Sequence, residues 1–590
     1  MSPRIPVLAL GLLLSATLRL PSQEFRALWS DAFNIGLNSS SEVTNLVNTA
    51  RAGNYNAIMA QVRKRGDAYY RNGLEPVAAA VLAGFDPLAD LITKAHDTSG
   101  GKPRLEVHAW LVTYNIWNSQ SGTPSQPTHP YNAHPEWLSE KYRANPADPL
   151  TPPVRWDGSN YMLDQGHPQV QQHNYNVAMD VLTRYQVDGI HFDYIRYSDD
   201  SSTNNQPWGY HPVSVARFQQ LKKRPGIPLP TDTTWLQWRR DQVTAFLRKV
   251  YLNAWSVKPQ ARISAALITY GNTAPGLGPT DFATQSEAYR RVLQDWHGWL
   301  QEGILDLACP MVYKTSSAGV TNWTDFVRRK QFNRASAIGL GSYLNSTATN
   351  LAQMKLGRAA VGTTGEKAVG LLGYSFAVTE NTATTTSQRL AARNESMAAL
   401  TEDATAELYD PGGDPLFATR ATPPAMPWKT DAAKGHLMGF VRDASTLASF
   451  DGATLTLTGP VTRTFISDGT GFFGTVDLPA GRYTLTVSMP GFGSQVRPVT
   501  VTGTQVRQES FQLRPPVLDW LSHSYNSPTR QATLTWTSET GQTFRVEYSD
   551  DLTLWLPHTT GLPSGGLSTS YLTPPTTPGT LRRWWRVKRE

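Results

Sequence analysis

The pattern of apolar and polar positions changes twice along this chain of 590 residues. From residue 25 to about residue 402, apolar runs of strand length alternate with longer stretches whose apolar residues recur at helical spacing. Strands are predicted over residues 25–30, 57–62, 105–112, 189–195, 263–267, 305–313, 337–343 and 369–375. Helices are predicted over residues 42–52, 87–96, 169–185, 235–256, 287–300, 323–330, 351–360 and 387–400. Strands that each precede a helix are typical of a closed parallel barrel, so we predict an α/β fold, a TIM (β/α)8 barrel, over residues 23–405.

The pattern after the barrel predicts β structure only. Residues 406–434 are rich in Pro and Gly and are predicted to form a linker or a strap along the barrel. From His436 onward, apolar and polar residues alternate in short runs separated by turn residues. This predicts two small all-β sandwich domains, over residues 435–513 and 514–590.

Four tryptophans of the second sandwich have two possible roles. They either form a sugar-stacking face or belong to the core and rim, which is the commoner role of aromatic residues in a small sandwich. These residues are Trp536, Trp555, Trp584 and Trp585.

The amino terminus has the build of a secretory signal. Arg4 is followed by the apolar run 5–14 and then by small residues, so residues 1–22 are predicted to be a signal peptide and the protein to be secreted, periplasmic or at the cell surface. A single cysteine, Cys309, excludes an intramolecular disulfide framework and a cysteine-type zinc site. It lies in an apolar run and is predicted to be a core residue.

Charge and aromatic content limit the kinds of molecule that the protein is expected to bind. The net charge of +7 is spread along the chain without the basic stripe that a nucleic-acid interface needs. The chain contains 18 Trp and 23 Tyr, whose flat faces suit sugar rings better than phosphates. We therefore expect a polysaccharide or glycan substrate, no nucleic acid, no integral membrane span and no cofactor or metal; the pattern leaves the oligomeric state open.

The strand over residues 189–195 carries the leading catalytic candidate. His191, Asp193 and Arg196 place three polar groups at the end of an otherwise apolar strand, where the active sites of such barrels lie. A carboxylate in that position is costly unless it is paired or functional, so Asp193 is the first candidate. The alternative is an Asp193 that caps the next loop or pairs with Arg196.

Other strand ends add carboxylates, cations and aromatic residues to the same rim, which together favour a sugar-binding cleft. The connection from residue 118 to 165 is long enough to form a wall or lid over it. Near its end, Asp164 is either a ligand or a turn and helix-capping residue. The predicted substrate-binding residues are Arg63, His108, Trp110, Tyr114, Asp164, His191, Tyr194, Arg196, Tyr313, Lys314 and Tyr343.

Several stretches of the barrel resemble the glycoside hydrolase-like family ten. They are residues 24–29, 61–63, 65–70, 106–110, 187–197, 238–241 and 310–314. The resemblance implies a TIM-type barrel in a secreted or surface hydrolase of polysaccharide, with bacterial peptidoglycan glycan among the substrates. The two C-terminal units resemble carboxypeptidase regulatory-like and fibronectin type III-like sandwiches.

Hydrolysis of a glycosidic bond needs two carboxylates, one to protonate the leaving oxygen and one to attack or to activate water. We predict Asp193 and Asp31, which ends the first strand, with Glu380 and Asp281 as substitutes for Asp31. The alternative for Asp31 is an ion pair with Arg63.

Three other hypotheses about the function are compared with glycoside hydrolysis. A substrate-assisted chitinase is excluded, since the frame D-x-x-D-x-D-x-E gives His191 for the second Asp and Ile195 for the final Glu. A catalytically silent carbohydrate-binding or surface scaffold and, more weakly, a metal-dependent deacetylase using His108, His191 and Asp193 stay open.

Overall fold

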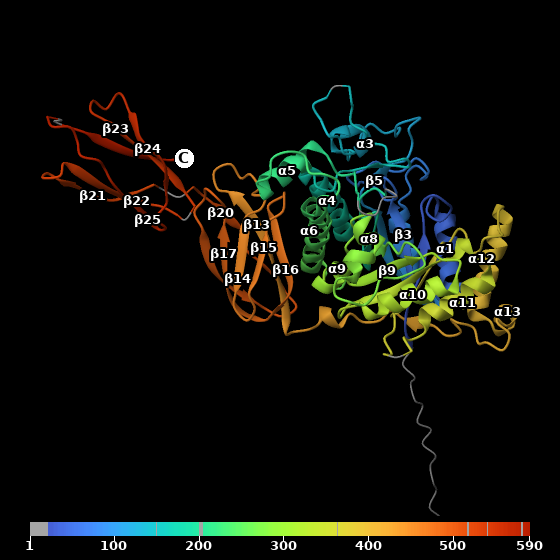
Figure 1. Ribbon diagram of the computed structural model, residues 1–590. Helices are drawn as coiled ribbons and strands as arrows, with labels where there is room; N and C mark the ends of the chain where they lie inside the picture. Colours follow the sequence, from blue (N-terminus) through green and yellow to red (C-terminus); the bar gives the residue numbers. More distant parts are fainter. Residues whose placement is uncertain are drawn as a thin grey trace, which may run out of the picture.

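A computed structural model describes residues 22–148, 150–199, 205–362, 364–515, 518–539, 541–579 and 582–590 (Figure 1). The first 21 residues of the predicted signal peptide lie outside this range. In the described part of the chain, no helix combines the length and the apolar composition needed to cross a membrane.

Eight parallel strands close into a barrel, which confirms the predicted fold class. Each strand matches its predicted range to within two residues at either end. The strands, in their order around the barrel, are β2 (Phe25–Ser30), β3 (Ala57–Arg63), β4 (Glu106–Val112), β7 (Gly189–Asp193), β8 (Arg262–Leu267), β9 (Leu307–Val312), β10 (Ala335–Gly341) and β11 (Gly370–Tyr374).

Helices surround the barrel (Figure 1). Polar N-caps fix where several of them begin; the Asp232 carboxylate, for example, accepts the backbone N–H groups of Thr234 and Trp235. The larger helices are α1 (Ser40–Ala52), α2 (Pro87–His96), α4 (Pro168–Arg184), α5 (Pro212–Lys222), α6 (Thr233–Val257), α10 (Ser317–Arg329), α11 (Thr347–Arg358) and α12 (Thr386–Thr401). Shorter elements are α3 (Pro130–Ala133), α7 (Asp281–Gln285), α13 (Asp403–Tyr409), β5 (Asn115–Trp117) and β6 (Tyr161–Met162).

The prediction of one continuous helix over residues 287–300 is wrong. Two short helices, α8 (Glu287–Arg290) and α9 (Trp296–Glu302), replace it. Between them Leu293 adopts a left-handed backbone conformation with φ of 51°, which a continuous helix cannot accommodate.

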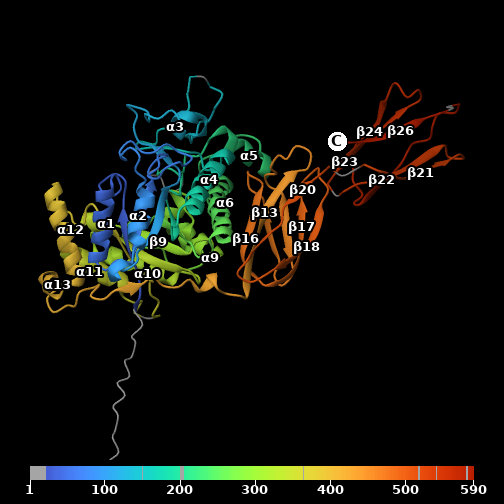
Figure 2. The same ribbon diagram turned by 180° about the vertical axis from the view of Figure 1, so that it is seen from behind.

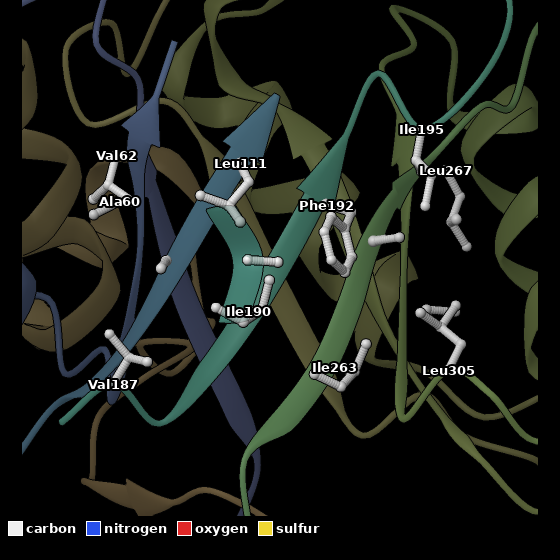
Figure 3. Packing of buried hydrophobic residues seen from close by; sticks show 14 of the residues in the cluster. Ala60, Val62, Leu111, Val187, Ile190, Phe192, Ile195, Ile263, Leu267 and Leu305 are labelled. Atoms are coloured by element: carbon white, nitrogen blue, oxygen red, sulfur yellow. The ribbon is translucent and has the colours of Figure 1, made fainter. Parts of the chain in front are cut away.

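Side chains alternate between the two faces of each strand, and this alternation positions the site. Figure 3 shows Ile190 and Phe192 of β7 packed with Leu111 and Ile263 in the core between sheet and helices. The intervening residues of β7 therefore face the barrel interior. A second core fills that interior and contains Phe25, Ala27, Trp29, Met59, Trp110, Leu307, Cys309 and Leu372. Cys309 is buried there, which confirms its predicted core role, and burial raises the pKa of its thiol.

The Pro/Gly-rich segment lies along the barrel. Its strand β12 (Ala421–Thr422) pairs with β1 (Ser22–Gln23), just before the first barrel strand. Further on, Trp428 Nε1 donates to the Asp306 carboxylate at 2.7 Å, and Lys429 Nζ lies 3.0 Å from the same carboxylate. Because Lys429 and Asp306 are almost completely buried, this pair fastens the segment to the barrel.

The first C-terminal unit consists of two four-stranded sheets that pack beside α5 and α6 (Figure 1). Arg217 of α5 forms a two-pronged ion pair with Asp451, at 2.7 and 3.0 Å, and Arg334 pairs with Asp477 at 2.9 Å. Ion pairs thus join the unit to the barrel. Its strands are β13 (Lys434–Asp443), β14 (Thr454–Thr458), β15 (Arg463–Ile466), β16 (Phe472–Pro479), β17 (Gly481–Ser488), β18 (Gln495–Val501), β19 (Val506–Gln508) and β20 (Phe511–Leu513).

The last unit lies beyond the first, at the end of the molecule farthest from the barrel (Figure 2). It contains two three-stranded sheets. Their strands are β21 (Trp520–Asn526), β22 (Gln531–Thr537), β23 (Thr543–Ser549), β24 (Leu556–Pro563), β25 (Ser568–Leu572) and β26 (Trp584–Arg589).

Candidate active site

A cavity of about 250 Å³ opens at the carboxyl ends of the barrel strands, where barrel chemistry is expected. Side chains from all parts of the rim line it. Six of them were predicted from the sequence: Trp110, Asp193, Tyr194, Arg196, Tyr313 and Tyr343. Others were not predicted as binding residues, including Trp29, Phe33, Gln61, Lys64, Arg65, Asn115 and Tyr374.

Asp193 lies at the end of β7 and faces this cavity. Its Oδ1 accepts the Tyr194 backbone N–H at 2.6 Å and an Arg196 Nη1–H at 3.2 Å, so the pairing weighed as an alternative is present. The described residues offer Oδ2 no hydrogen bond. The carboxylate is therefore fixed through one oxygen while the other remains available to a bound molecule.

A strained turn supports this arrangement. Tyr194 has a φ of 48°, in the left-handed region that costs a residue with a side chain about 1 kcal/mol or more. The turn brings the Arg196 guanidinium to 4.0 Å from the centre of the Tyr194 ring. Backbone strain is thus accepted where it places an ion pair and an aromatic ring at the cavity.

Asp31 follows β2 and is 2% exposed. Its Oδ1 accepts the backbone N–H groups of Phe33 and Asn34, at 2.9 and 3.1 Å, in a tight turn. Its Oδ2 is buried and has no partner in the described chain. Asp31 does not belong to the cavity wall. Tyr374 does, and burial together with the charges of Asp31 and Asp193 raises the pKa of its hydroxyl, so both carboxylates act on the same wall residue.

Arg63 lies outside the cavity lining, and its ion pair is with Glu75 and not with Asp31. Its guanidinium contacts Glu75 at 2.6 and 2.7 Å and donates to the backbone carbonyls of Val112 and Thr113. Burial alone would raise the pKa of Glu75, but the Arg63 charge holds it well below its usual range. Four hydrogen bonds hold the guanidinium within the barrel wall, so the structure does not bring Arg63 to the cavity with the other predicted binding residues.

His191 faces the barrel interior but lies beneath the cavity, outside its lining. Trp29 Nε1, which can only donate, is 3.0 Å from His191 Nε2. Nδ1 must then carry the proton, and it donates to Ser264 Oγ at 2.9 Å. Nε2 thus helps to hold Trp29 in the cavity wall while Nδ1 is bound to Ser264, so neither ring nitrogen of His191 is free to reach the cavity.

Burial lowers the pKa of His191 to about 3, with a smaller contribution from His108. Between this value and the ordinary 6.5, the unfolded chain binds a proton that the folded chain excludes. The free energy of unfolding is therefore expected to decrease as the pH falls, by about 2 kcal/mol from this residue between pH 7 and 5. Urea unfolding at both pH values measures this.

The matched variant is His191→Gln, whose amide can accept from Trp29 and donate to Ser264 without titrating. It should lose about 2 kcal/mol less than the parent over that interval. Equal losses in the two proteins would show that His191 is not the acid-sensitive group.

Four further predicted binding residues lie outside the cavity. His108 contacts Phe25 at the start of β2 and Glu106 at 3.0 Å, which places it at the amino-terminal end of the barrel. Tyr114 packs on Phe246 of α6, on the helix side of the sheet. Each prediction named the correct strand or loop but the wrong depth or face.

Asp164 and Lys314 have structural partners. Asp164 Oδ1 accepts the Gly166 backbone N–H and the Ser214 hydroxyl, which is the turn role named as one of its two interpretations, and Asp164 lies outside the cavity lining. Lys314 Nζ donates to the Thr269 carbonyl. The substitutes Glu380 and Asp281 do not line the cavity either.

The deacetylase alternative does not fit this geometry. Its three ligands were His108, His191 and Asp193, but His191 has no free nitrogen and His108 lies at the other end of the barrel. Within the described ranges, no three His, Cys, Asp or Glu side chains are grouped as metal ligands would be.

Aromatic rings form most of the cavity wall. Tyr313 and Tyr374 stack with centroids 5.5 Å apart and an interplanar angle of 18°. Tyr343 meets both edge-on, at 6.0 and 5.7 Å, and Trp29 and Trp110 approach Tyr374 at 6.2 and 6.3 Å. Tyr374 is thus the centre of the wall, and its place at an inward-facing strand end was the signal that could have identified it.

Two cations from the loop after β3 complete the wall. Lys64 Nζ and the Arg65 guanidinium lie 4.7 and 4.5 Å from the Phe33 ring centre. Burial lowers the pKa of both side chains. Both line the cavity, and neither forms an ion pair with a carboxylate of the described chain.

Comparison with known proteins agrees with this architecture. The Glycosyl hydrolase-like 10 family model matches residues 24–351, and the carboxypeptidase regulatory-like domain model matches residues 436–514. "Glycosyl hydrolase DigH" of Escherichia coli (strain K12) is 24% identical over 297 residues, which cover 46% of this chain and 59% of that protein. "Glycosyl hydrolase YngK" of Bacillus subtilis (strain 168) is 23% identical over 310 residues, covering 49% and 54%.

Among solved structures, the PgaB (BpsB) glycoside hydrolase domain from Bordetella bronchiseptica aligns with 60% of this chain and 94% of its own, at 14% identity and a TM-score of 0.40. The matches to the DigH and YngK proteins span 59% and 54% of those proteins, so this chain corresponds to little more than half the length of either relative. The family model, in contrast, covers more than half of the 590 residues, and the chain belongs to the Glycosyl hydrolase-like 10 family.

Proposed function

We propose that the protein is a glycoside hydrolase that cleaves glycosidic bonds of a polysaccharide in the barrel cavity. The observation that carries this proposal is Asp193, a carboxylate with one fixed and one available oxygen in a cavity walled by aromatic rings. Sugar rings stack on aromatic faces, and their cleavage uses a carboxylate at the anomeric carbon. Membership of the family supports the same reaction class.

The two carboxylates suit different roles. Arg196 stabilises a negative charge on Asp193, which fits the group that attacks the anomeric carbon or activates water. Asp31 has no cationic partner in the part of the chain that is described, and its Oδ2 lacks a hydrogen bond. We propose Asp31 as the group that protonates the leaving oxygen; it is buried outside the cavity lining, so this role requires its Oδ2 to become accessible when the glycan binds. An NMR spectrum of the first product formed would show whether the anomeric configuration is retained or inverted.

The aromatic wall is expected to bind the sugar ring. Tyr343 is 38% exposed, so truncating it removes a stacking surface with little effect on the core. Tyr343→Ala should raise KM about tenfold with a smaller change in kcat, because a lost aromatic contact costs about 1–1.5 kcal/mol. Steady-state kinetics measure this.

Tyr343→Phe is the matched control, since it keeps the ring and removes only the hydroxyl. Its KM should stay within about twofold of the parent value, since only the stacking surface carries the effect. An unchanged KM in Tyr343→Ala would exclude this ring from substrate binding.

The cations of the wall point to an acidic glycan. Lys64, Arg65 and Arg196 line the cavity, and only Arg196 is paired with a carboxylate there. Peptidoglycan glycan strands without stem peptides, whose muramic acid has a free carboxylate, are our first candidate substrate. We propose that the protein acts outside the cytoplasm, as the sequence of the first 22 residues indicates.

The proposal is tested by incubating the purified protein with peptidoglycan glycan strands and with neutral polysaccharides, and by measuring new reducing ends. Release from the acidic strands supports the proposal. Binding of the strands without any new reducing end would instead favour the catalytically silent scaffold.

A further inference from the structure

The last β unit contains a second and larger cavity. It measures about 700 Å³, within the range typical of small-molecule and sugar sites. Its walls come from β21 and β22 on one side and from the start of β26 on the other. This unit lies beyond the first β unit and away from the barrel (Figures 1 and 2), and the two cavities share no lining residue, so they are separate sites.

The inner face of β21 explains why the cavity exists. In the ladder between β21 and β22, Trp520 pairs with Trp536, His523 with Leu534 and Tyr525 with Ala532. Directly paired residues of antiparallel strands share a face, and the three β22 residues belong to the core. Trp520, His523 and Tyr525 therefore face the interior of the sandwich, yet β21 is exposed along its whole length. The opposite sheet does not cover this strand.

Two tryptophans at the cavity, Trp520 and Trp584, do not belong to the hydrophobic core of this unit. Trp536 is 1% exposed and central to the core, as the commoner of the two predicted roles requires. Trp585 packs on the edge of that core. Trp520 is 46% exposed, and neither it nor Trp584 belongs to the core cluster, although both line the cavity. Aromatic rings on both sides of a cavity, here the exposed Trp520 and the half-buried Trp584, suit a flat ligand with apolar faces.

The polar groups of the cavity are donors and cations. Arg582 is exposed and forms no ion pair with the described residues, whereas Arg583 is held by Asp550 at 2.7 and 2.8 Å. His523, Ser524 and Thr576 add further hydrogen-bonding groups, and no carboxylate lines the cavity. The site is therefore complementary to an anionic ligand rich in hydroxyl groups.

We propose that this cavity binds an acidic polysaccharide, with sugar rings stacked on Trp520 and Trp584 and a carboxylate facing Arg582. Such a site would hold the polymer at a distance from the barrel and raise its local concentration there. It does not depend on the barrel being a hydrolase, because binding at this site needs no chemistry.

The test uses the full chain carrying Asp193→Asn and Tyr343→Ala, so that the barrel does not cut the polymer and holds it less tightly. Polygalacturonate and dextran serve as acidic and neutral probes, and binding is measured by affinity electrophoresis and calorimetry. Trp520→Ala and Trp584→Ala should each weaken polygalacturonate binding about tenfold or more, as expected for aromatic residues central to an interface. Dextran should bind more weakly than polygalacturonate in the unsubstituted cavity.

Trp555→Ala is the matched control, because Trp555 packs under Arg586 at 4.3 Å and does not line the cavity. It should bind polygalacturonate within about twofold of its parent. Arg582→Gln, at an exposed position that cannot disturb the core, should weaken binding of polygalacturonate but not of dextran.

Equal affinities in the parent and in the Trp520 and Trp584 variants would overturn the proposal. It would also fail if the exposed edge of β21 joined two copies of the chain, which sedimentation of the parent and of Trp520→Ala would reveal. Hydrolysis measured in the Trp520→Ala protein with an intact barrel is a separate readout, so either proposal can fail without the other.

Discussion

Replacing Asp193 with Asn is expected to reduce kcat for polysaccharide hydrolysis about a thousandfold or more, because the reaction loses the carboxylate that acts at the anomeric carbon. The fold should be retained. The amide oxygen introduced by Asp193→Asn can still accept the Tyr194 N–H that Asp193 Oδ1 accepts at 2.6 Å. Reducing-end kinetics and circular dichroism measure the two outcomes.

Asp199→Asn provides the matched control. Asp199 lies on the same loop, is paired with Arg291 and does not line the cavity. Its variant should keep activity within a few-fold of the parent. Undiminished hydrolysis by Asp193→Asn would remove Asp193 from the mechanism, and Asp31→Asn would then decide whether Asp31 takes part in it.

Removing Glu75 is expected to have the largest effect on stability. The side chains of Arg63 and Glu75 are 2% and 0% exposed, so Glu75→Ala leaves a guanidinium buried without its counter-charge. Breaking a buried pair in this way costs about 3–5 kcal/mol. Urea unfolding of the barrel should show a loss of that size. Because Arg63 also holds the carbonyls of Val112 and Thr113, the loops that carry Lys64 and Asn115 should loosen.

Asp97→Ala is the control for this prediction. Asp97 and Lys102 form an ion pair whose side chains are 36% and 49% exposed. Exposed ion pairs contribute little to stability, so this variant should unfold close to the parent. Similar losses in the two variants would mean that the Arg63–Glu75 pair does not stabilise the barrel as its burial indicates.

The barrel strands and the leading carboxylate could be predicted from the sequence because both follow from local patterns. The apolar runs have strand length, and in β7 the alternation of Ile190 and Phe192 with His191 and Asp193 marks the inward face. A carboxylate at the end of such a strand stands out against its apolar neighbours. Trp110 and Tyr313 share this signal, and both line the cavity.

How deep in the barrel each inward-facing side chain lies could not be predicted in the same way. His108, His191 and Asp193 are all on inward faces, but only Asp193 reaches the cavity. The stagger between neighbouring strands sets the height of each side chain, and the residues of one strand do not encode it. His108 and His191 are therefore buried in the packed interior, where their polar atoms contact Glu106, Trp29 and Ser264.

Ion pairs between residues that a loop separates also could not be predicted from the sequence. Arg63 finds Glu75 twelve positions later, and nothing local distinguishes that acid from Asp31 as a partner. Phe33, Lys64 and Arg65 lie in loops, where no periodic pattern indicates the direction of a side chain. They enter the cavity wall only because the barrel brings their loops together.

The central claim is that water cleaves a glycosidic bond in the barrel cavity with Asp193. It is tested most directly by incubating the glycan strands in water enriched in oxygen-18 and weighing the products by mass spectrometry. The account predicts one heavy oxygen in each new reducing end with the parent protein and no product with Asp193→Asn. Product that lacks the label, or labelled product at the parental rate from Asp193→Asn, would contradict it.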